Sequence, residues 1–248
     1  MIRLLTDLLP CEPAAGLGLE EALFETARSG AGDSLRVWVN DRAVVIGRSQ
    51  VARSEVDLDR AKALGIPLLR RLSGGGTIYH YPGNLNVSLF LADAGSLGSV
   101  DATFDKVGRI LAHAVSTSGA PVVALGNSLL IGRTKVGGAA QARRGSSLLF
   151  HTTLLVRPDT IRMDGLLLAL RLGYRPLGVP SHPHPTTTLA EAFRDEPSAE
   201  SLARAIAEAM GGLLGRPVRA APVTTAEEER AAILAEARYR SDLWNLSR

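Results

Sequence analysis

Apolar residues recur at helical spacing in several segments of the chain. The segment 99–119 is the clearest example, because its apolar side chains fall on one face of a helix at intervals of three or four residues. These side chains are Val100, Phe104, Val107, Leu111 and Val115. The same spacing predicts further helices over 16–30, 54–65, 159–172, 188–196, 198–215 and 225–244.

Other segments alternate between apolar and polar residues or form short apolar runs, which indicates strands. The predicted strands cover 34–40, 42–47, 66–72, 77–81, 84–91, 121–125, 128–132, 134–141 and 146–156. The first two flank Asn40-Asp41, which predicts a hairpin. Residues 173–188 are rich in proline and polar side chains, and we expect a long functional loop there. Clustered strands with intervening helices predict a mixed α/β sheet rather than strict βαβ alternation.

Composition narrows the class of protein. A chain of 248 residues, 46% hydrophobic and 21% charged, fits one large domain with a sizeable core. The formal charge of +3 comes from scattered basic residues with few aromatics, which argues against a nucleic-acid binder. The lone cysteine, Cys11, excludes an internal disulfide framework and a cysteine-based metal cluster. Without a membrane-length apolar run or a signal-peptide pattern, we expect a cytoplasmic protein.

The run Ser73-Gly74-Gly75-Gly76 is the first candidate for chemistry. Glycines allow backbone N–H groups to converge on an anion without obstruction by Cβ atoms, and Arg70 and Arg71 precede the run. A flexible glycine hairpin is the alternative. The pattern is neither a Walker loop nor a Rossmann fingerprint, since a strand follows it.

Four ordered segments together resemble the lipoate–protein ligase A family, within the biotin and lipoyl protein ligases. They are Gly47-Arg48-Ser49-Gln50, the stretch from Arg70 to Asn84, Lys135-Val136-Gly137-Gly138-Ala139, and His151-Thr152-Thr153-Leu154-Leu155. They correspond to the family's GR-x-Q, RR-x-SGGG-x-x-x-H-x-x-GN, K-x-x-G-x-A and HGTLL segments. The closing YRSDLWN also resembles the end of the family's catalytic domain, so the resemblance covers nearly the whole chain.

The resemblance implies a fold and an activity. The fold would be a mixed, largely antiparallel sheet flanked by helices, of the biotin and lipoyl ligase catalytic-domain type. Residues 1–248 would form a single catalytic domain without a C-terminal accessory domain. Members activate lipoate with ATP and Mg²⁺ to lipoyl-AMP. They then transfer the lipoyl group to a lysine of E2 lipoyl domains or of glycine-cleavage H protein. A separate small accessory protein is a further expected partner, and neither nucleic acid nor membrane is expected.

The resemblance also implies roles for individual residues. Lys135 matches the catalytic lysine, although a solvated strand lysine is the alternative on spacing alone. The segment Ser73–Gly76 with Arg70 and Arg71 would hold the acyl-phosphate and line the lipoyl tunnel. Further substrate and nucleotide contacts are expected from His80, Asn84, Asn127, Gly137, Ala139, His151, Thr187 and Thr188. No metal ligand is identified.

Departures from the family pattern leave other interpretations open. Ser128 stands where many ligases carry an aspartate connected with Mg²⁺, and Tyr81, Thr152 and Val51 also depart from the motifs. One alternative is a lipoyl or octanoyl transferase that uses a preformed acyl-AMP or an acyl-carrier donor. A cysteine-dependent route would need a thiol later in the chain, which has none after Cys11. A non-catalytic nucleotide- or acyl-binding module is the other alternative. The sequence does not decide between lipoate and octanoate, or the oligomeric state.

Overall fold

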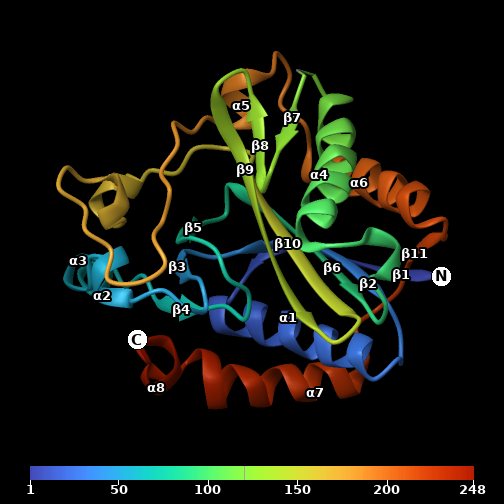
Figure 1. Cartoon of the computed structure of the whole chain (residues 1–248), viewed down its shortest axis with the longest axis horizontal. Helices are drawn as coiled ribbons and strands as arrows, with labels where there is room; N and C mark the ends of the chain where they lie inside the picture. The colour runs from blue at the N-terminus through green and yellow to red at the C-terminus, as the bar shows by residue number, and fades with distance from the viewer. Residues whose placement is uncertain (120) are drawn as a thin grey trace.

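The computed structural model describes residues 1–119 and 121–248. Within this part of the chain the main sheet has eight strands, in the order β11-β1-β2-β6-β10-β9-β8-β7 (Figure 1). They are β1 (Ile2–Cys11), β2 (Ser34–Asn40), β6 (Asn84–Leu91), β7 (Val123–Leu125), β8 (Ser128–Ile131), β9 (Thr134–Arg144), β10 (Ser147–Leu155) and β11 (Val218–Ala220). Strand β1 is parallel to β2 and β11, while the other neighbours are antiparallel. The predicted mixed, largely antiparallel sheet is confirmed.

A second sheet of three strands has the order β4-β3-β5. Its strands are β3 (Ala43–Ile46), β4 (Leu68–Arg70) and β5 (Ile78–His80). Strand β3 pairs with β4 in parallel and with β5 antiparallel. The predicted hairpin at Asn40-Asp41 is therefore wrong, because β2 and β3 belong to different sheets and the chain crosses from one to the other at this point.

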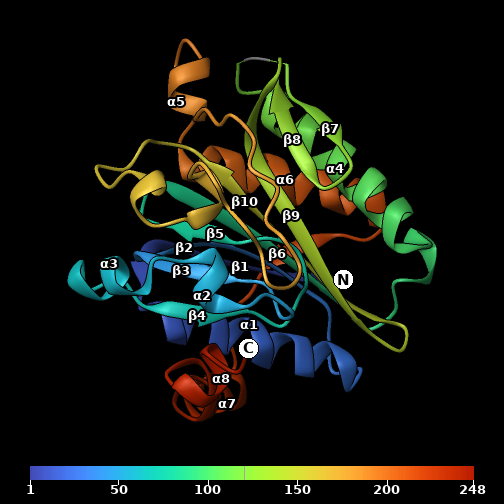
Figure 2. The same cartoon turned by 60° about the vertical axis from the view of Figure 1, so that its left-hand side comes forward.

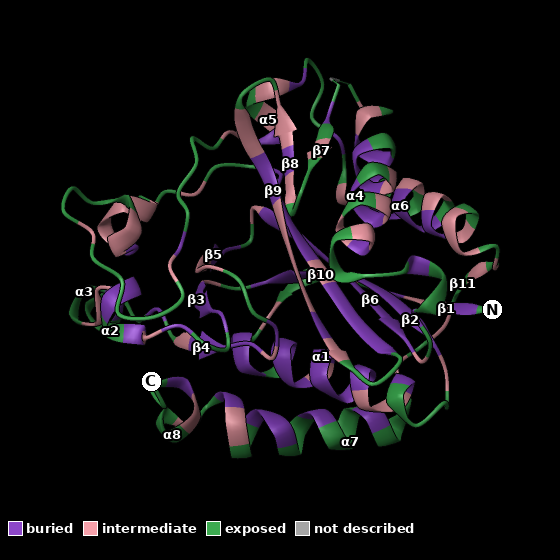
Figure 3. Cartoon of the chain, in the orientation of Figure 1, coloured by how far each residue is buried: buried purple, intermediate pink, exposed green. Residues whose placement is uncertain are grey.

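Helices cover both faces of the main sheet. Helix α1 (Pro13–Arg28) lies between the main sheet and α7 (Thr225–Leu234), while α8 (Asp242–Asn245) packs beside β4 of the small sheet (Figure 1). Helices α4 (Val100–Ser116) and α6 (Ala199–Leu214) pack together against the opposite face, where most of the apolar core lies. The central strands are consequently buried on both faces (Figure 3).

Strand β6 explains where the site lies. Its sequence NLNVSLFL alternates, and Leu85, Val87, Leu89 and Leu91 enter the core beneath α4 and α6. The other face of the strand carries polar side chains that are also buried. Such polar groups need hydrogen-bond partners, and the small sheet and its loops supply part of them, as described below.

Two predicted helices are interrupted by one contact. Residues 54–65 form the short helices α2 (Ala52–Glu55) and α3 (Leu58–Ala63), and 159–172 contains only 3₁₀ turns at Met163–Gly165 and Leu168–Leu170. Val56, between α2 and α3, is extended and forms an antiparallel bridge with Leu167. Both residues are buried beside the small sheet, so tertiary pairing replaces helical hydrogen bonds in both segments.

The remaining loops close the fold around the site. The segment 173–188 runs from the loops of the small sheet to β9 and ends at the short helix α5 (Leu189–Ala192) (Figure 2). The N-terminal strand β1 and the short β11 were not predicted from the sequence. Among the described residues, no helix is both long and apolar enough to cross a membrane.

Candidate active site

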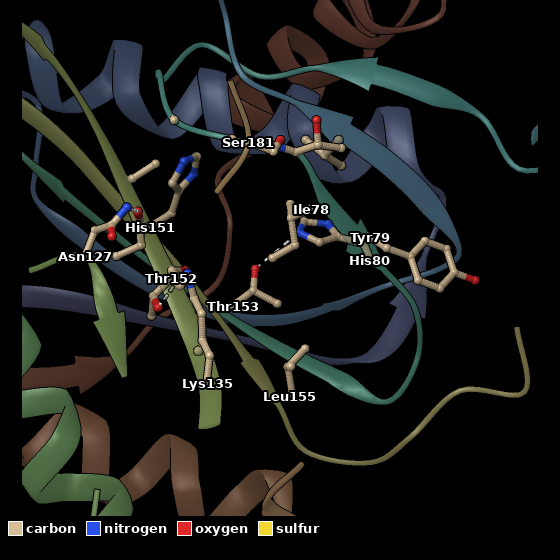
Figure 4. A pocket seen from close by; sticks show the side chains of 18 of the residues that line it. Ile78, Tyr79, His80, Asn127, Lys135, His151, Thr152, Thr153, Leu155 and Ser181 are labelled. Atoms are coloured by element: carbon tan, nitrogen blue, oxygen red, sulfur yellow. Dashed lines mark hydrogen bonds between the residues drawn. The ribbon is translucent and has the colours of Figure 1, made fainter. Parts of the chain in front are cut away.

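A cavity of about 290 Å³ lies between β6, β9 and β10 of the main sheet and the loops of the small sheet. Figure 4 shows Lys135 on β9, with Thr152 and Thr153 on β10, and Ile78 and His80 on β5. The cavity lining includes both exposed residues, such as Asn127, and buried residues, such as Trp38. Part of the cavity wall is therefore exposed to solvent, and part of it is buried.

Arg71 holds the glycine loop from its inner side. Its guanidinium donates hydrogen bonds to Ser73 Oγ at 3.0 Å and to the carbonyls of Gly74 and Gly76 at 2.6 and 2.7 Å. Burial lowers the pKa of Arg71 to about 10, so the side chain stays charged at neutral pH. The carbonyls of Gly74 and Gly76 accept from this cation, and the N–H groups of Gly74, Gly75 and Gly76 have no acceptor among the described residues. The loop has the free donors that an anion nest requires.

Two glycines give this loop its shape. Gly75 has φ +84°, a conformation that side-chain-bearing residues rarely adopt. A Cβ atom on Gly47 would lie 2.1 Å from the Gly75 carbonyl oxygen, so the GR-x-Q segment can pass the loop only with glycine at that position. The first two family segments thus form one packed unit.

Arg70 has a different position from the one expected. It is buried, and its guanidinium donates to the carbonyls of Gly47, Arg48, Gln50, Trp244 and Asn245. These bonds tie the GR-x-Q segment to the end of the chain, and Arg70 does not line the cavity. The expectation of a direct phosphate contact therefore needs correction. The sequence gives no reason to separate the two arginines, and their roles differ because Arg70 ends β4 and points into the core, whereas Arg71 follows the strand and points towards the glycine loop.

Lys135 projects into the cavity from β9. Burial lowers the pKa of its ammonium group. Within the described residues, the ammonium has neither a hydrogen-bond acceptor nor a carboxylate partner. A Cβ atom on Gly138 would lie 3.0 Å from Lys135 Cε and 3.1 Å from Nζ. Gly138 therefore provides the space in which the lysine lies along its own strand.

The segment Ser181–Thr187 fixes the opposite wall at both ends. Ser181 Oγ accepts hydrogen bonds from Gln50 Nε2 and the Thr77 N–H and donates to the buried Glu55 carboxylate at 2.6 Å. At the other end the Lys135 N–H donates to the Pro185 carbonyl, and the Thr187 N–H donates to the Lys135 carbonyl. Between these anchors, His182 and His184 line the cavity. The loop that the sequence predicted to be functional borders the cavity directly.

His151 belongs to a network of hydrogen bonds beneath the glycine loop. Its Nδ1 lies 3.0 Å from Glu20 Oε1, and its Nε2 lies 2.6 Å from Ser73 Oγ. Ser88 also donates to Glu20. Burial alone would raise the pKa of Glu20, but its contacts with His151 and Ser88 hold that pKa below its usual value. Glu20 therefore stays a carboxylate and orients His151, which in turn positions Ser73.

His80 is neutral for a structural reason. Burial lowers the pKa of its imidazole to about 3. Asn40 Nδ2 lies 3.1 Å from His80 Nδ1, and Thr153 Oγ1 lies 3.2 Å from Nε2. Both ring nitrogens are thus occupied by neutral partners, and His80 serves as a fixed part of the cavity wall.

The structure brings together most but not all of the predicted site residues. Those that line the cavity are Arg71, Gly75, Gly76, His80, Asn127, Lys135, Gly137, Ala139 and His151. Ser73 and Gly74 stand just behind the wall, bonded to Arg71. Asn84 is buried and donates to the Tyr79 carbonyl. Thr187 and Thr188 do not line the cavity, since Thr188 caps α5 and Thr187 donates to Glu191. Their neighbour Thr186 lines the cavity instead.

Sequence reasoning missed several residues of the wall. Glu20, Trp38, Asn86, Ser88 and Ser181 come from segments that were predicted only as helix, strand or loop. One signal was available for Asn86 and Ser88, because a strand whose polar face is made of amides and hydroxyls is unusual for a solvated sheet. The contribution of Glu20 depends on helix packing, which no local pattern reveals.

Comparison with known proteins places this site in a family. The sequence model of the lipoyl protein ligase A/B catalytic domain matches residues 12–211, which include the cavity-lining residues described above. The chain belongs to the lipoyl protein ligase A/B catalytic-domain family. The resemblance inferred from the four sequence segments is confirmed.

Individual relatives of this ligase-family chain carry related names. Lipoate-protein ligase A subunit 1 of Thermoplasma acidophilum is 28% identical over 98% of this chain and 96% of its own. A protein of Aeropyrum pernix, provisionally named lipoate-protein ligase A, is 35% identical over 63% of this chain but only 58% of its own length. The octanoyltransferase LipM of Symbiobacterium thermophilum is 30% identical over 84% of each chain.

Solved structures agree with the family fold. A Thermoplasma acidophilum structure with bound lipoic acid has a TM-score of 0.81 and 26% identity and covers 99% of each chain. A bipartite lipoate protein ligase of the same organism, described with its E2 lipoyl domain, has a TM-score of 0.82 and 25% identity over 99% of this chain and 97% of its own. A lipoate-protein ligase A bound with ATP has a TM-score of 0.81 and 27% identity over 99% of this chain and 98% of its own.

Proposed function

We propose that this protein is a lipoate–protein ligase that activates lipoate with ATP to lipoyl-AMP and transfers the lipoyl group to a lysine of a carrier domain. One observation carries the proposal. The ammonium of Lys135, without a partner among the described residues, shares one cavity with a glycine loop whose N–H groups also lack acceptors. A cation and a donor nest on one cavity suit a ligand with a phosphate and a carboxyl group.

The first half-reaction joins two anions. A lipoate carboxylate oxygen attacks the α-phosphorus of ATP, the bond to the β-phosphate oxygen breaks, and pyrophosphate leaves. The repulsion between carboxylate and phosphate opposes their approach, and the Lys135 ammonium between them offsets it. Since no carboxylate among the described residues pairs with Lys135, its charge is available to the substrates.

The second half-reaction transfers the acyl group to nitrogen. The neutral amine of a carrier lysine attacks the acyl carbon, the bond to the phosphate oxygen breaks, and AMP leaves while the nitrogen loses a proton to solvent. Negative charge grows on the departing phosphate, and the N–H groups of Gly75 and Gly76, which line the cavity, would stabilise it together with Lys135. Arg71 and Ser73 keep the loop in the receptive conformation.

The described residues provide no metal cage. No group of three or more His, Cys, Asp or Glu side chains is placed to hold an ion in this part of the chain. Glu20, the carboxylate of the cavity wall, is bonded to His151 and Ser88, and Ser128, which also lines the cavity, offers only a hydroxyl. The residues do not fit a protein-held Mg²⁺, and the steps above are not routed through one.

Partners follow from the same proposal. The acceptor would be a carrier with an accessible lysine, such as an E2 lipoyl domain or glycine-cleavage H protein. The bipartite Thermoplasma ligase, which resembles this chain over nearly its full length, supports a separate small accessory protein as a second partner. Transfer from a preformed acyl-AMP, with adenylation completed by that partner, is the alternative that Ser128 keeps open.

ATP–pyrophosphate exchange tests the proposal directly. Lipoate should stimulate exchange by the purified chain, either alone or after addition of a candidate accessory protein. Transfer should be followed separately by the mass of an E2 lipoyl domain incubated with chemically prepared lipoyl-AMP. If lipoyl-AMP leaves the carrier unmodified and no exchange occurs in either condition, the ligase proposal is wrong.

A further inference from the structure

Asn86 on β6 has a buried amide nitrogen without a hydrogen-bond partner. The residue is 2% exposed, lines the cavity, and its Nδ2 has no acceptor within the described residues. Leaving a buried donor unsatisfied costs about 1–3 kcal/mol, so such groups in a folded protein call for an explanation. In the described part of the chain, the two other unpaired buried side-chain atoms belong to Arg36 and Asn84, neither of which lines the cavity.

A chain of hydrogen bonds directs this donor. Asn40 Nδ2 donates to His80 Nδ1, which leaves the proton of the neutral ring on Nε2 to be donated to Thr153 Oγ1. The Thr153 hydroxyl donates in turn to Asn86 Oδ1 at 2.7 Å. With its oxygen held by Thr153, the amide of Asn86 is fixed and its Nδ2 is the free end of the chain.

The position of Asn86 indicates which end of a bound acyl chain would contact its amide nitrogen. Strand register places Asn86, Thr153 and Gly138 in one row across β6, β10 and β9, and the Lys135 side chain lies beside Gly138. A carboxyl group that reacts at Lys135 therefore lies at the β9 end of this row. Asn86 lies opposite Trp38 in the sheet, and Trp38 is 1% exposed. An acyl chain with its carboxyl at Lys135 therefore extends its far end towards Trp38 and Asn86.

We infer that Asn86 makes the buried part of the cavity selective for an acyl chain whose tail carries a hydrogen-bond acceptor, as the sulfur atoms of a dithiolane ring do, over one that ends in methyl. This inference rests on the proposed function and concerns its substrate. A methyl-ended octanoyl chain would leave Nδ2 unpaired, whereas a sulfur atom is a weak acceptor that can satisfy it. Sites built around a buried polar group reject analogues that lack its partner.

The test compares acids that differ only in the ring atoms. Lipoate and 5-cyclopentylpentanoate share ring size and chain length, but the second has no sulfur, and octanoate has neither ring nor sulfur. Calorimetric titration of the wild-type protein with each free acid needs neither ATP nor carrier. We expect lipoate to bind roughly three- to tenfold more tightly than the cyclopentyl acid, the range of one net hydrogen bond.

Variants then assign the preference to one residue. Asn86→Leu, of similar size, should reduce the ratio of the two dissociation constants to about one. Ser88→Ala is the matched control, since Ser88 lies on the same strand face and its hydroxyl is already bonded to Glu20. The control should leave the ratio unchanged even if both affinities fall. If Asn86→Leu does not fold, Asn86→Ala replaces it, with thermal unfolding confirming the native state.

The outcomes separate this inference from the proposed function. Tight binding of lipoate with an equal affinity for the cyclopentyl acid overturns the role of Asn86 and leaves the ligase proposal standing. A wild-type preference that persists in the Asn86 variants also overturns it. Failure of the wild-type protein to bind any of the three acids overturns both.

Discussion

At the scale of single residues, Lys135 is the side chain on which the proposed chemistry depends. We expect Lys135→Ala to abolish both lipoate-dependent pyrophosphate exchange and transfer from lipoyl-AMP. Its free energy of unfolding should change by less than about 1 kcal/mol, because the ammonium has no partner to lose among the described residues. Lys62→Ala, at an exposed position of α3, is the control. Near-normal transfer by Lys135→Ala would remove this residue from the catalytic role.

Gly138 stands at the glycine of the K-x-x-G-x-A pattern, and we expect it to be a positioning residue, although the sequence analysis named Gly137 as the contact. A methyl group there would press on Lys135 Cε and Nζ, so Gly138→Ala should move the ammonium without removing it. We expect kcat for transfer to fall by about 10-fold or more, since small displacements of a catalytic group are costly. The KM for the carrier should be unchanged. Gly212→Ala, where a Cβ would meet open space, should leave kcat intact. Equal effects on both variants would contradict the steric explanation.

His80 predicts a dependence of stability on pH. Its pKa is about 3 in the folded protein, against 6.5 for the free side chain, so the unfolded state binds the extra proton. The folded state therefore keeps its full free energy of unfolding above pH 6.5. It loses part of this free energy progressively as the pH falls from 6.5 towards 3. At pH 5 it should lower the free energy of unfolding by about 2 kcal/mol relative to neutral pH. Urea unfolding at pH 7 and pH 5 measures this loss of stability. The loss should be smaller by about 2 kcal/mol in His80→Gln and unchanged in His113→Gln, which alters an exposed histidine.

At the scale of structural elements, the conformation of the glycine loop depends on Gly75 within the loop and on its contacts with Arg71 and Gly47 outside it. Gly75→Val should close the nest, because valine is strained at φ +84° and its Cβ would lie 3.1 Å from Arg71 Nη2. We expect the affinity for lipoyl-adenylate to fall at least about tenfold with the fold retained. Gly65→Ala, at another positive φ but in open space, controls for backbone strain alone. An unchanged calorimetric affinity would mean that the loop is only a turn.

At the scale of the whole molecule, the position of Cys11 bears on the mechanism. Its thiol is half-buried, lies 3.6 Å from Asn40 Oδ1, and does not line the cavity. Burial raises the pKa of this thiol, and only a thiolate is a competent nucleophile. We expect Cys11→Ser to transfer lipoate from lipoyl-AMP at the wild-type rate, with no acyl-protein thioester by intact mass spectrometry.

Two results would change this interpretation. A stable thioester on Cys11, or loss of transfer in Cys11→Ser, would favour the transferase route suggested by the similarity to LipM. Transfer from lipoyl-AMP without ATP-dependent ligation would instead identify a chain that needs its accessory partner for adenylation. The transfer rate of Cys11→Ser, the search for a thioester and the ATP-dependent assay together distinguish these two results from the expected one.

The sequence by itself determined the family, the general fold and most of the residues to which the proposed chemistry is assigned. Glycines, paired arginines and a lysine at fixed spacing are local features, because turns and strand faces depend on neighbouring residues. For that reason Lys135, Arg71 and the glycine loop could be predicted from the order of the motifs.

The tertiary structure decided what depends on contacts between distant segments. The bridge between Val56 and Leu167 interrupted two helices that propensity favoured. Packing directed Arg70 into the core and Arg71 towards the cavity, although they are adjacent in sequence. The free donor of Asn86 exists only because Asn40, His80 and Thr153 come together from three strands. Hydrogen-bond partners across a sheet are fixed by register and crossing loops, which no local pattern contains.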